Sequence, residues 1–268
     1  MKITAATYNI HRCIGLDHRQ DHERIRSVLE EMTPDLVALQ EVEIRHNHSP
    51  NVLAHLTGGT GYQYILGPTM ESGKGHYGNA LITRHPVRAV RRLDLSFPGR
   101  EPRGALDVDI RIHDRLIRVL TTHLGLHPLE RRQQVKKLLR ALTEPTGSPV
   151  TILMGDINEW YLWGSPLRWI HKYFGATRNI RTFPANLPIF ALDRIWCHPR
   201  ERLLSLYSHN TRASKTASDH LPLVAENLGH AHLFAQHTFH DLVLYLAKAL
   251  ISTSTPAGSS SFIKASTV

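Results

Sequence analysis

The residues best suited to chemistry in this sequence are polar side chains that follow short apolar runs. In PVTILMGDIN, residues 149–158, an apolar strand pattern ends on Asp156 and Asn158, which one isoleucine separates. A simple turn needs only Gly155 and one Asn or Asp. The additional polar side chain indicates a role beyond turning the chain, and a carboxylate such as Asp156 can deprotonate a water molecule. If the backbone stays extended here, both side chains share one face and reach one phosphate.

The same pattern recurs along the chain. We predict that strand after strand finishes on a residue able to bind metal or phosphate, and these residues are Asn9, Glu41, His123, Asp156, Asn158, Asp193, Asp219 and His220. Each alone has an ordinary explanation as a turn former or a core histidine. Together they indicate a site, because ligands and catalysts gather where strands of packed sheets open into loops.

These residue types favour hard-cation and phosphoryl chemistry. The amide of Asn9 and the carboxylate of Glu41 are oxygen donors that suit Mg²⁺. An imidazole can donate to the anionic oxygens of a phosphoryl group, and an aspartate can fix that imidazole. Structural zinc is not indicated, since Cys13 and Cys197 stand far apart and no histidine pair in the set has close helical spacing.

The elements that must position these residues are mostly strands. We expect strands over 2–9, 36–40, 76–83, 86–95, 104–112, 115–124 and 150–154, around ALDRIW, and at LPLVAEN. One helix pattern runs through Ile25 to Met32, and a second places Val135, Leu138, Leu139 and Leu142 on one face with its basic residues elsewhere. Many strands with few helices between them predict a mixed, two-sheet α/β layered domain.

Composition limits the classes of protein that remain. The chain has 268 residues, 41% of them hydrophobic, and a formal charge of +9, which favours anionic partners. The start MKITAATYNI alternates polar and apolar residues, which predicts a strand rather than a signal peptide. The presence of only two cysteines predicts a reducing compartment, so we expect a cytoplasmic location.

The ordered set TYN, QE, THL, GDIN, LDRI and SDH resembles the endonuclease/exonuclease/phosphatase superfamily of Mg²⁺-dependent phosphoesterases, which includes DNase I, abasic-site endonucleases, sphingomyelinases and inositol-polyphosphate phosphatases. The resemblance covers roughly residues 2–227, and RTFPANLPIFALDRIW is similar to small stand-alone bacterial members. It implies a DNase I-like four-layer α/β sandwich, two packed mixed β-sheets flanked by helices, with a catalytic domain over 1–228. It also implies Mg²⁺ as cofactor, with Mn²⁺ as the alternative.

The resemblance assigns roles residue by residue. Asn9 and Glu41 would hold the metal, with Asp219 near it. Asp156 would activate or orient the attacking water, and Asn158 would position the water or the phosphate. His220 would stabilise the developing charge with Asp193 behind it, and His123 would touch another phosphate oxygen; whether the aspartate or the histidine is the general base stays open.

Further residues have two readings each. Arg103 and Arg181 either contact substrate phosphates as fixed cations or are solvent-exposed arginines of a basic chain. Trp160, Tyr161 and Trp163 either wall a substrate groove or pack under the active-site loops, and we expect the second. THL in place of the repair branch's tyrosine-containing loop favours phosphodiesterase or phosphatase members over abasic-DNA cleavage.

The final forty residues, 229–268, match no part of the motif set. FHDLVLYLAKALI, residues 239–251, predicts an apolar helix that docks on the domain or lies on a membrane surface, since it is short of the roughly 20 residues that a spanning helix needs. The Ser/Thr-rich remainder is typical of disorder.

Three functions are compatible with these observations. The first is a Mg²⁺-dependent phosphodiesterase or phosphatase acting on nucleic acid, phospholipid or a small phosphodiester, cytoplasmic or peripheral to the inner face of an anionic membrane. The second is a nuclease of the same fold, and the third is an inactive phosphate-binding protein, which the competent residue at every expected position speaks against.

Overall fold

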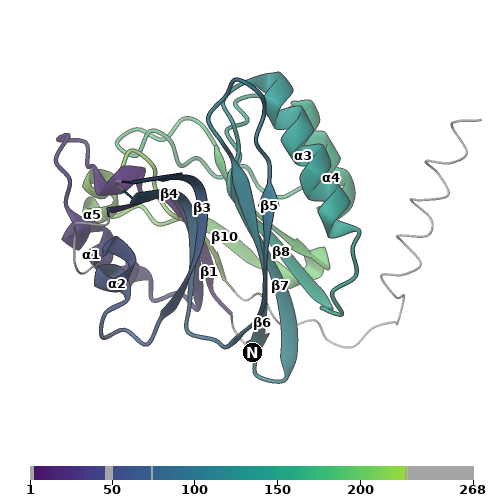
Figure 1. Ribbon diagram of the computed structural model, residues 1–268, viewed down its shortest axis with the longest axis horizontal. Helices are drawn as coiled ribbons and strands as arrows, with labels where there is room; N and C mark the ends of the chain where they lie inside the picture. Colours follow the sequence, from purple (N-terminus) through teal and green to yellow (C-terminus); the bar gives the residue numbers. More distant parts are fainter. Residues whose placement is uncertain (1–2, 46–50, 74, 227, 229–268) are drawn as a thin grey trace, which may run out of the picture. The chain divides into compact units, whose positions relative to one another are not determined.

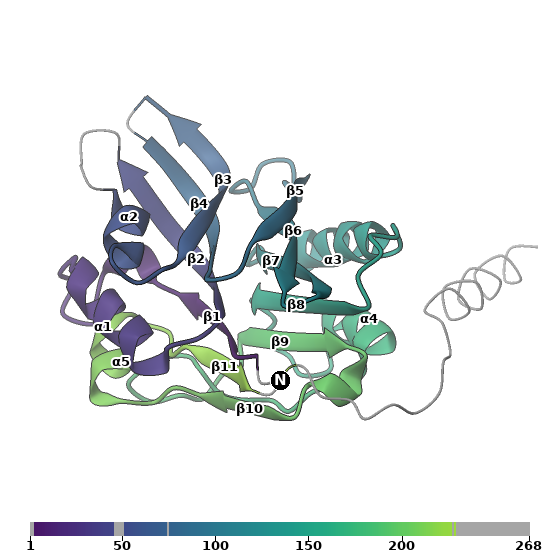
Figure 2. The ribbon, with the colours of Figure 1, turned by 90° about the horizontal axis from the view of Figure 1, so that it is seen from below.

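Two mixed β-sheets pack face to face, and helices cover the outer face of each. The computed structural model describes residues 3–45, 51–73, 75–226 and 228. Figure 1 shows α1 (His22–Met32), α2 (Val52–Thr57) and α5 (Arg212–Ala217) on one side of the sheets and α3 (Pro128–Leu142) and α4 (Ser165–Phe174) on the other. The view from below in Figure 2 shows the same four layers, helices, sheet, sheet and helices, as the sequence predicted.

The first sheet contains six strands in the order β10-β11-β1-β2-β4-β3. Its strands are β1 (Ala5–Asn9), β2 (Leu36–Arg45), β3 (Gln63–Ser72), β4 (Gly75–Thr83), β10 (Ser205–Ser208) and β11 (Leu223–Glu226). Only β1 and β2 run parallel; the other neighbours are antiparallel.

The second sheet contains five strands in the order β5-β6-β7-β8-β9. They are β5 (Val87–Asp94), β6 (Gly104–Ile112), β7 (Arg115–His123), β8 (Val150–Asp156) and β9 (Asp193–His198), with short 3₁₀ turns η1 (His11–Cys13) and η2 (Arg200–Arg202) elsewhere in the chain. The parallel pair here is β7 and β8, joined by α3. Parallel neighbours need such a crossover, and it puts the ends of β7 and β8 at the same edge.

Apolar side chains fill the three interfaces between the layers. One cluster lies between the sheets and includes Leu36, Val108 and Ile152. A second joins the six-stranded sheet to α1 and α2, and a third joins the five-stranded sheet to α3 and α4. Strands buried on both faces explain the near-continuous apolar runs of VTILM and LVALQ.

Several elements differ from the sequence-based expectation. The helices α2, α4 and α5 and the strands β3 and β10 were not expected; β3 is an edge strand whose Gly67 and Pro68 hide its periodicity. Arg131 is buried in α3 rather than on the polar face, because its guanidinium reaches Glu159 and the carbonyl of Gly125. The predicted helix and tail of residues 229–268 lie outside the described residues. Among the described residues, no helix has the length and apolar content to span a bilayer.

Candidate active site

Strand pairing brings the predicted polar residues to one edge of both sheets. In the five-stranded sheet His123 pairs with Asp156, and Asp156 pairs with Asp193, so three neighbouring strands present these side chains in a row. In the other sheet Asn9 ends β1 beside Gln40. Since the sheets face each other, Asn9 meets Asp156 across the interface, with Asn9 Nδ2 3.1 Å from Asp156 Oδ2.

Not every one of these residues ends a strand. Asp193 begins β9, and Asp219 and His220 precede β11, so the prediction that strands finish on them is wrong. They nevertheless reach the same edge, because β9 and β11 run antiparallel to β8 and β1. An antiparallel strand starts where its partner ends.

Glu41 is also not a strand end, because β2 continues to Arg45. The register with β4 shifts between Leu39 and Val42, and Glu41 has φ of 57°. A bulge of this kind re-aims a side chain. Here it brings Glu41 Oε1 to 3.2 Å from Asn9 Nδ2.

Asn158 lies in the site through a turn and not through an extended backbone. Its φ is 50°, and its backbone N–H donates to Asp156 Oδ1 at 2.9 Å, so the expectation of alternation along one face is wrong. Asp156 instead closes a local side-chain turn, as aspartate often does. The Asn158 amide then donates to the Leu124 carbonyl at 2.9 Å and lies 3.0 Å from His123 Nε2.

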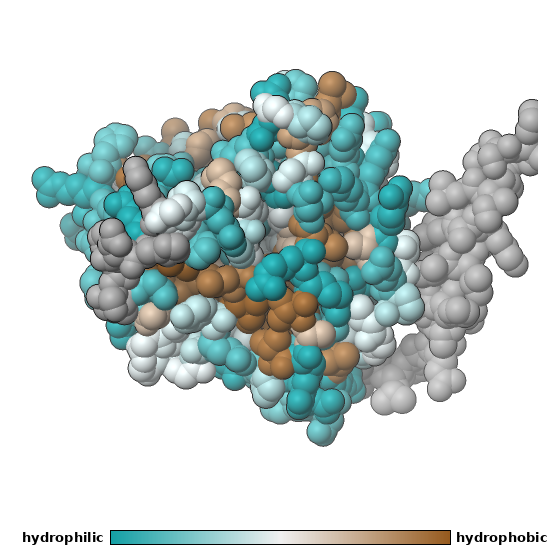
Figure 3. All heavy atoms as spheres, in the orientation of Figure 1, coloured by the Kyte–Doolittle hydropathy of each residue, from teal (hydrophilic) through white to brown (hydrophobic). Residues whose placement is uncertain are grey.

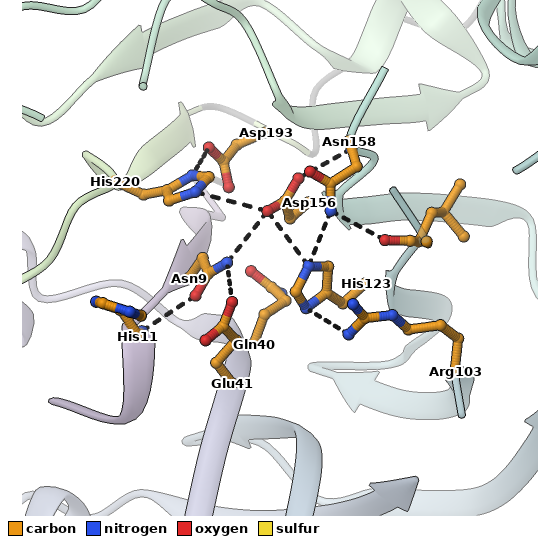
Figure 4. A network of polar contacts seen from close by, with 12 residues as sticks. Asn9, His11, Gln40, Glu41, Arg103, His123, Asp156, Asn158, Asp193 and His220 are labelled. Carbon is orange, nitrogen blue, oxygen red and sulfur yellow. Dashed lines mark hydrogen bonds and ion pairs between the residues drawn. The ribbon is translucent and has the colours of Figure 1, made fainter. Parts of the chain in front are cut away.

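The polar network centres on Asp156, which is 1% exposed (Figure 4). Its Oδ2 lies 3.1 Å from Asn9 Nδ2, 3.5 Å from His123 Nε2 and 3.7 Å from His220 Nε2. The carboxylate is therefore surrounded by one amide and two imidazoles from three different strands or loops.

The two histidines have opposite protonation. Burial lowers the pKa of His220, but the carboxylates of Asp193 and Asp156 outweigh it and raise that pKa to about 10. Burial lowers the pKa of His123 to about 3, and the positive charges of Arg103 and His220 add to this despite Asp156. Near neutral pH, His220 is therefore an imidazolium and His123 is neutral.

Residues around the two rings fix their orientation. His220 Nδ1 donates to Asp193 Oδ2 at 2.8 Å, and Thr182 Oγ1 donates to the same oxygen at 2.6 Å. Arg103 Nη1 donates to His123 Nδ1 at 3.3 Å, while His123 Nε2 lies 3.0 Å from Asn158 Nδ2 and 3.5 Å from Asp156 Oδ2.

The two arginines lie in different surroundings. Arg103 is buried, in contact with His123 and paired with Glu101 at 3.0 Å, so its reading as a solvent-exposed residue is wrong. Arg181 is exposed, and in the part of the chain that the structure describes no hydrogen bond or ion pair joins it to the network.

Asp219 stands slightly apart from Asn9 and Glu41. Its Oδ1 lies 3.8 Å from His11 Nδ1, and the backbone N–H of His11 donates to Asn9 Oδ1 at 3.1 Å. Ser218, its neighbour, donates to the Asn9 carbonyl at 2.7 Å and so attaches the SDH loop to the end of β1.

Oxygen donors in the site fit a divalent cation in two ways. Glu41 and Asp156 converge on the Asn9 amide, and two carboxylates with an amide form a hard donor set. Asp156, Asp193 and His220 also offer atoms within 4.8 Å of one another. We favour the first set, because Nδ1 of the His220 imidazolium is already bound to Asp193.

Sequence reasoning missed several residues that the site uses. Gln40 of the QE motif is fully buried, and its Nε2 has no partner among the described residues. Thr182 carries no sequence signal, and Ser218 was assigned no role although it belongs to the SDH motif, because both contacts depend on how distant segments pack. Trp160, Tyr161 and Trp163 are exposed rather than packed under the loops, so that expectation is wrong.

Comparisons with known proteins agree with this architecture. Residues 6–220 match the model of the Endonuclease/Exonuclease/phosphatase family. Uncharacterized protein YbhP of Escherichia coli (strain K12) is 30% identical over 246 residues, which cover 82% of this chain and 94% of that protein.

Solved structures share the fold. An endonuclease/exonuclease/phosphatase from Beutenbergia cavernae superposes with a TM-score of 0.67 at 21% identity, covering 88% of this chain and 74% of that one. A protein of the same description from Bacteroides vulgatus superposes with a TM-score of 0.67 at 20% identity, covering 84% of this chain and 98% of that one. Humanized D. rerio TDP2 superposes with a TM-score of 0.60 at 19% identity, covering 84% of this chain and 98% of that one.

Proposed function

Because the chain belongs to the endonuclease/exonuclease/phosphatase family, we propose that it is a Mg²⁺-dependent phosphoric ester hydrolase, a phosphodiesterase or phosphatase. The observation that carries this proposal is the position of Asp156 between a neutral and a charged histidine, with its Oδ2 3.5 Å and 3.7 Å from their Nε2 atoms. A base beside a fixed cationic donor is the pair of groups that ester hydrolysis needs.

The residues divide the reaction among them. Asp156 accepts a proton from the attacking water as its oxygen bonds to phosphorus, and Asn158 positions that water or the phosphate. His220, held by Asp193, directs Nε2–H at a phosphoryl oxygen and stabilises the charge that grows as the ester P–O bond breaks. His123 and Arg103 contact a further phosphate oxygen.

Asn9 and Glu41 would hold the cation, with Asp156 and Asp219 beside them. Their oxygen donors suit Mg²⁺, and Mn²⁺ accepts the same set. When bound, the cation supplies Lewis-acid polarisation of a phosphoryl oxygen.

The experiment is hydrolysis of bis-p-nitrophenyl phosphate and of the monoester with Mg²⁺, Mn²⁺ or EDTA. We expect metal-dependent diester cleavage that falls about a hundredfold or more in Asp156→Ala and in His220→Ala. Asp114→Ala, an exposed aspartate in the β6–β7 hairpin at the opposite edge, is the matched control. Near-wild-type rates in Asp156→Ala would contradict the assigned role.

A nuclease is the second candidate. The charge of +9 and the exposed rings of Trp160, Tyr161 and Trp163 favour it, because bases stack on aromatic faces. A structure of D. rerio TDP2, which shares the fold, is complexed with a single-strand DNA product. Cleavage of plasmid or oligonucleotide at low salt, where phosphate contacts are strongest, separates this candidate from the first.

A cytoplasmic location belongs to the same proposal. Cys13 and Cys197 are both free and buried, which suits a reducing compartment. Peripheral membrane contact through residues 239–251 would be tested by co-sedimentation with liposomes before and after deletion of residues 237–268.

A further inference from the structure

An apolar rim stands on the surface beside the candidate site. We define it by six side chains, each more than half exposed: Leu126, Leu129, Tyr161, Trp163, Leu187 and Ile189. They come from the loop after β7 and the first turn of α3, from the loop after β8, and from the loop before β9. Figure 3 shows apolar residues along the upper edge of the view, near the upper end of α3. Exposed apolar residues gathered in this way mark an interaction surface, whereas single ones need no explanation.

The three loops that carry the rim are fixed to one another. Arg131 bonds the carbonyl of Leu126 and pairs with Glu159, which joins the loop after β7 to the loop after β8. The Trp160 ring packs edge-on against Phe190 at 4.8 Å, which joins the loop after β8 to the loop before β9. The segments that carry the rim are therefore held in place by contacts with one another.

The rim is also connected directly to the site. The ring centroid of Phe183 lies 4.8 Å from that of His220 and 5.8 Å from that of Trp160, the neighbour of Tyr161. A partner seated on the rim would therefore lie against the entrance to the network around Asp156.

The segment that carries four of the six rim residues has charge of one sign. Residues 160–192 contain no Asp or Glu, and they carry the basic residues Arg168, Lys172, Arg178 and Arg181. Arg181 stands two residues before Phe183, Arg168 lies in the first turn of α4, and Arg132 lies in α3 three residues after Leu129. All three are exposed, and within the described ranges no ion pair engages any of them. Glu159 and Asp193, the acids that flank this segment, are buried, and so is Glu130 in the first turn of α3.

We propose that the rim docks on an anionic phospholipid bilayer. Exposed Leu, Ile, Trp and Tyr side chains with exposed arginines in the same segments are suited to a membrane interface, where apolar groups enter the acyl boundary and cations meet anionic headgroups. Four of the six rim residues are aliphatic and offer no face for base stacking, which favours lipid over single-stranded nucleic acid. If the proposed function holds, the docked site cleaves esters presented at the lipid surface.

The test is co-sedimentation of the full chain with vesicles of phosphatidylcholine alone and with an equal part of phosphatidylglycerol. We expect binding to the anionic vesicles, and a loss of about tenfold or more in the double variant Trp163→Ser/Leu187→Ser, because two apolar anchors are removed. These side chains are 73% and 69% exposed, so the substitutions leave the core intact. Arg181→Glu, made alone, should also weaken binding to anionic vesicles, because it replaces a cation by an anion.

Matched controls lie at the opposite edge of the sheets. Leu204 is 61% exposed and precedes β10, whose first residue, Ser205, pairs with Glu226 at the end of β11. Arg115 is exposed and begins β7. Leu204→Ser and Arg115→Glu should bind as the wild-type chain does. All variants keep the C-terminal segment, so a difference between them reports on the rim.

The proposal would be overturned if the wild-type chain did not bind anionic vesicles, or if Trp163→Ser/Leu187→Ser bound them as tightly as the wild-type chain does. It would also be overturned if that double variant lost binding to oligothymidine but kept its binding to vesicles. Asp156→Ala should bind vesicles normally. If the vesicle pattern holds while the wild-type chain cleaves neither nitrophenyl ester, docking is supported and the hydrolase assignment is contradicted.

Discussion

Asp193 Oδ2 lies 2.8 Å from Nδ1 of His220, and both side chains are buried at the interface of the two sheets. The carboxylate keeps the imidazole in one orientation and stabilises its charged form. The opposite nitrogen, Nε2, is thereby held 3.7 Å from Asp156 Oδ2. The relationship predicts that Asp193 acts through His220 and not on the substrate directly.

Asp193→Asn should lower both the pKa of His220 and turnover. The amide removes the negative charge that opposes burial, so the pKa should fall from about 10 toward its ordinary value or below. We expect turnover to drop about 10- to 100-fold, as loss of an orienting partner does at comparable sites. NMR titration of the His220 ring in metal-free protein, with steady-state kinetics, checks both. An unchanged ring pKa would refute the coupling, and Asp114→Asn is the control.

Stability should depend on pH through His220 in a defined direction. Its pKa is raised in the folded chain from 6.5 to about 10, so protonation favours folding. That contribution is complete below about pH 6.5 and is lost as the pH rises through about 10. The melting temperature of the wild-type chain minus that of His220→Gln, measured in EDTA, should therefore be constant at low pH and shrink as the solution becomes alkaline. A difference that grows with pH would contradict the assignment.

Arg118→Met should destabilise the fold strongly. Arg118 and Asp107 are 3% and 1% exposed and are joined by two hydrogen bonds of 2.9 and 2.7 Å between adjacent strands. Removing the guanidinium leaves a buried carboxylate with Arg91 as its remaining partner, at a cost of about 3–5 kcal/mol. Urea unfolding measures the loss.

The double variant Asp107→Leu/Arg118→Met serves as the check on that mechanism. Because it removes the uncompensated charge together with its partner, it should recover part of the stability lost in Arg118→Met. Strict additivity of the two single changes would show that the pair is not coupled. Arg45→Met, which breaks an exposed pair with Glu43, should shift the unfolding midpoint little.

The two thiols should be chemically inert in the folded chain. Burial raises the pKa of Cys13 to about 12 and that of Cys197 to about 12. Since the thiolate is the reactive form, iodoacetamide at about pH 8 should label neither residue at an appreciable rate until urea unfolds the protein. Mass spectrometry after timed labelling reads this out, and rapid labelling of Cys13 without denaturant would show that the loop around η1 opens.

The sequence determined the layered fold and most of the residues that form the site. Apolar runs buried on both faces, α1 and α3, and the residues at the ends of β1, β7 and β8 are all readable from local pattern. Those residues recur with the chemistry of hard-cation and phosphate binding. The pattern does not depend on which strands become neighbours, so these residues can be identified from the sequence before the topology is known.

Only the tertiary structure decided how the site residues meet. The bulge that re-aims Glu41, the turn that carries Asn158 and the register that sets Asp193 beside Asp156 depend on strand pairing between distant segments. Protonation is likewise nonlocal, because His123 and His220 differ through burial and through which charges the fold places beside them. One chain of ordinary histidines and aspartates thus acquires a neutral imidazole and a charged one only when the two sheets close on each other.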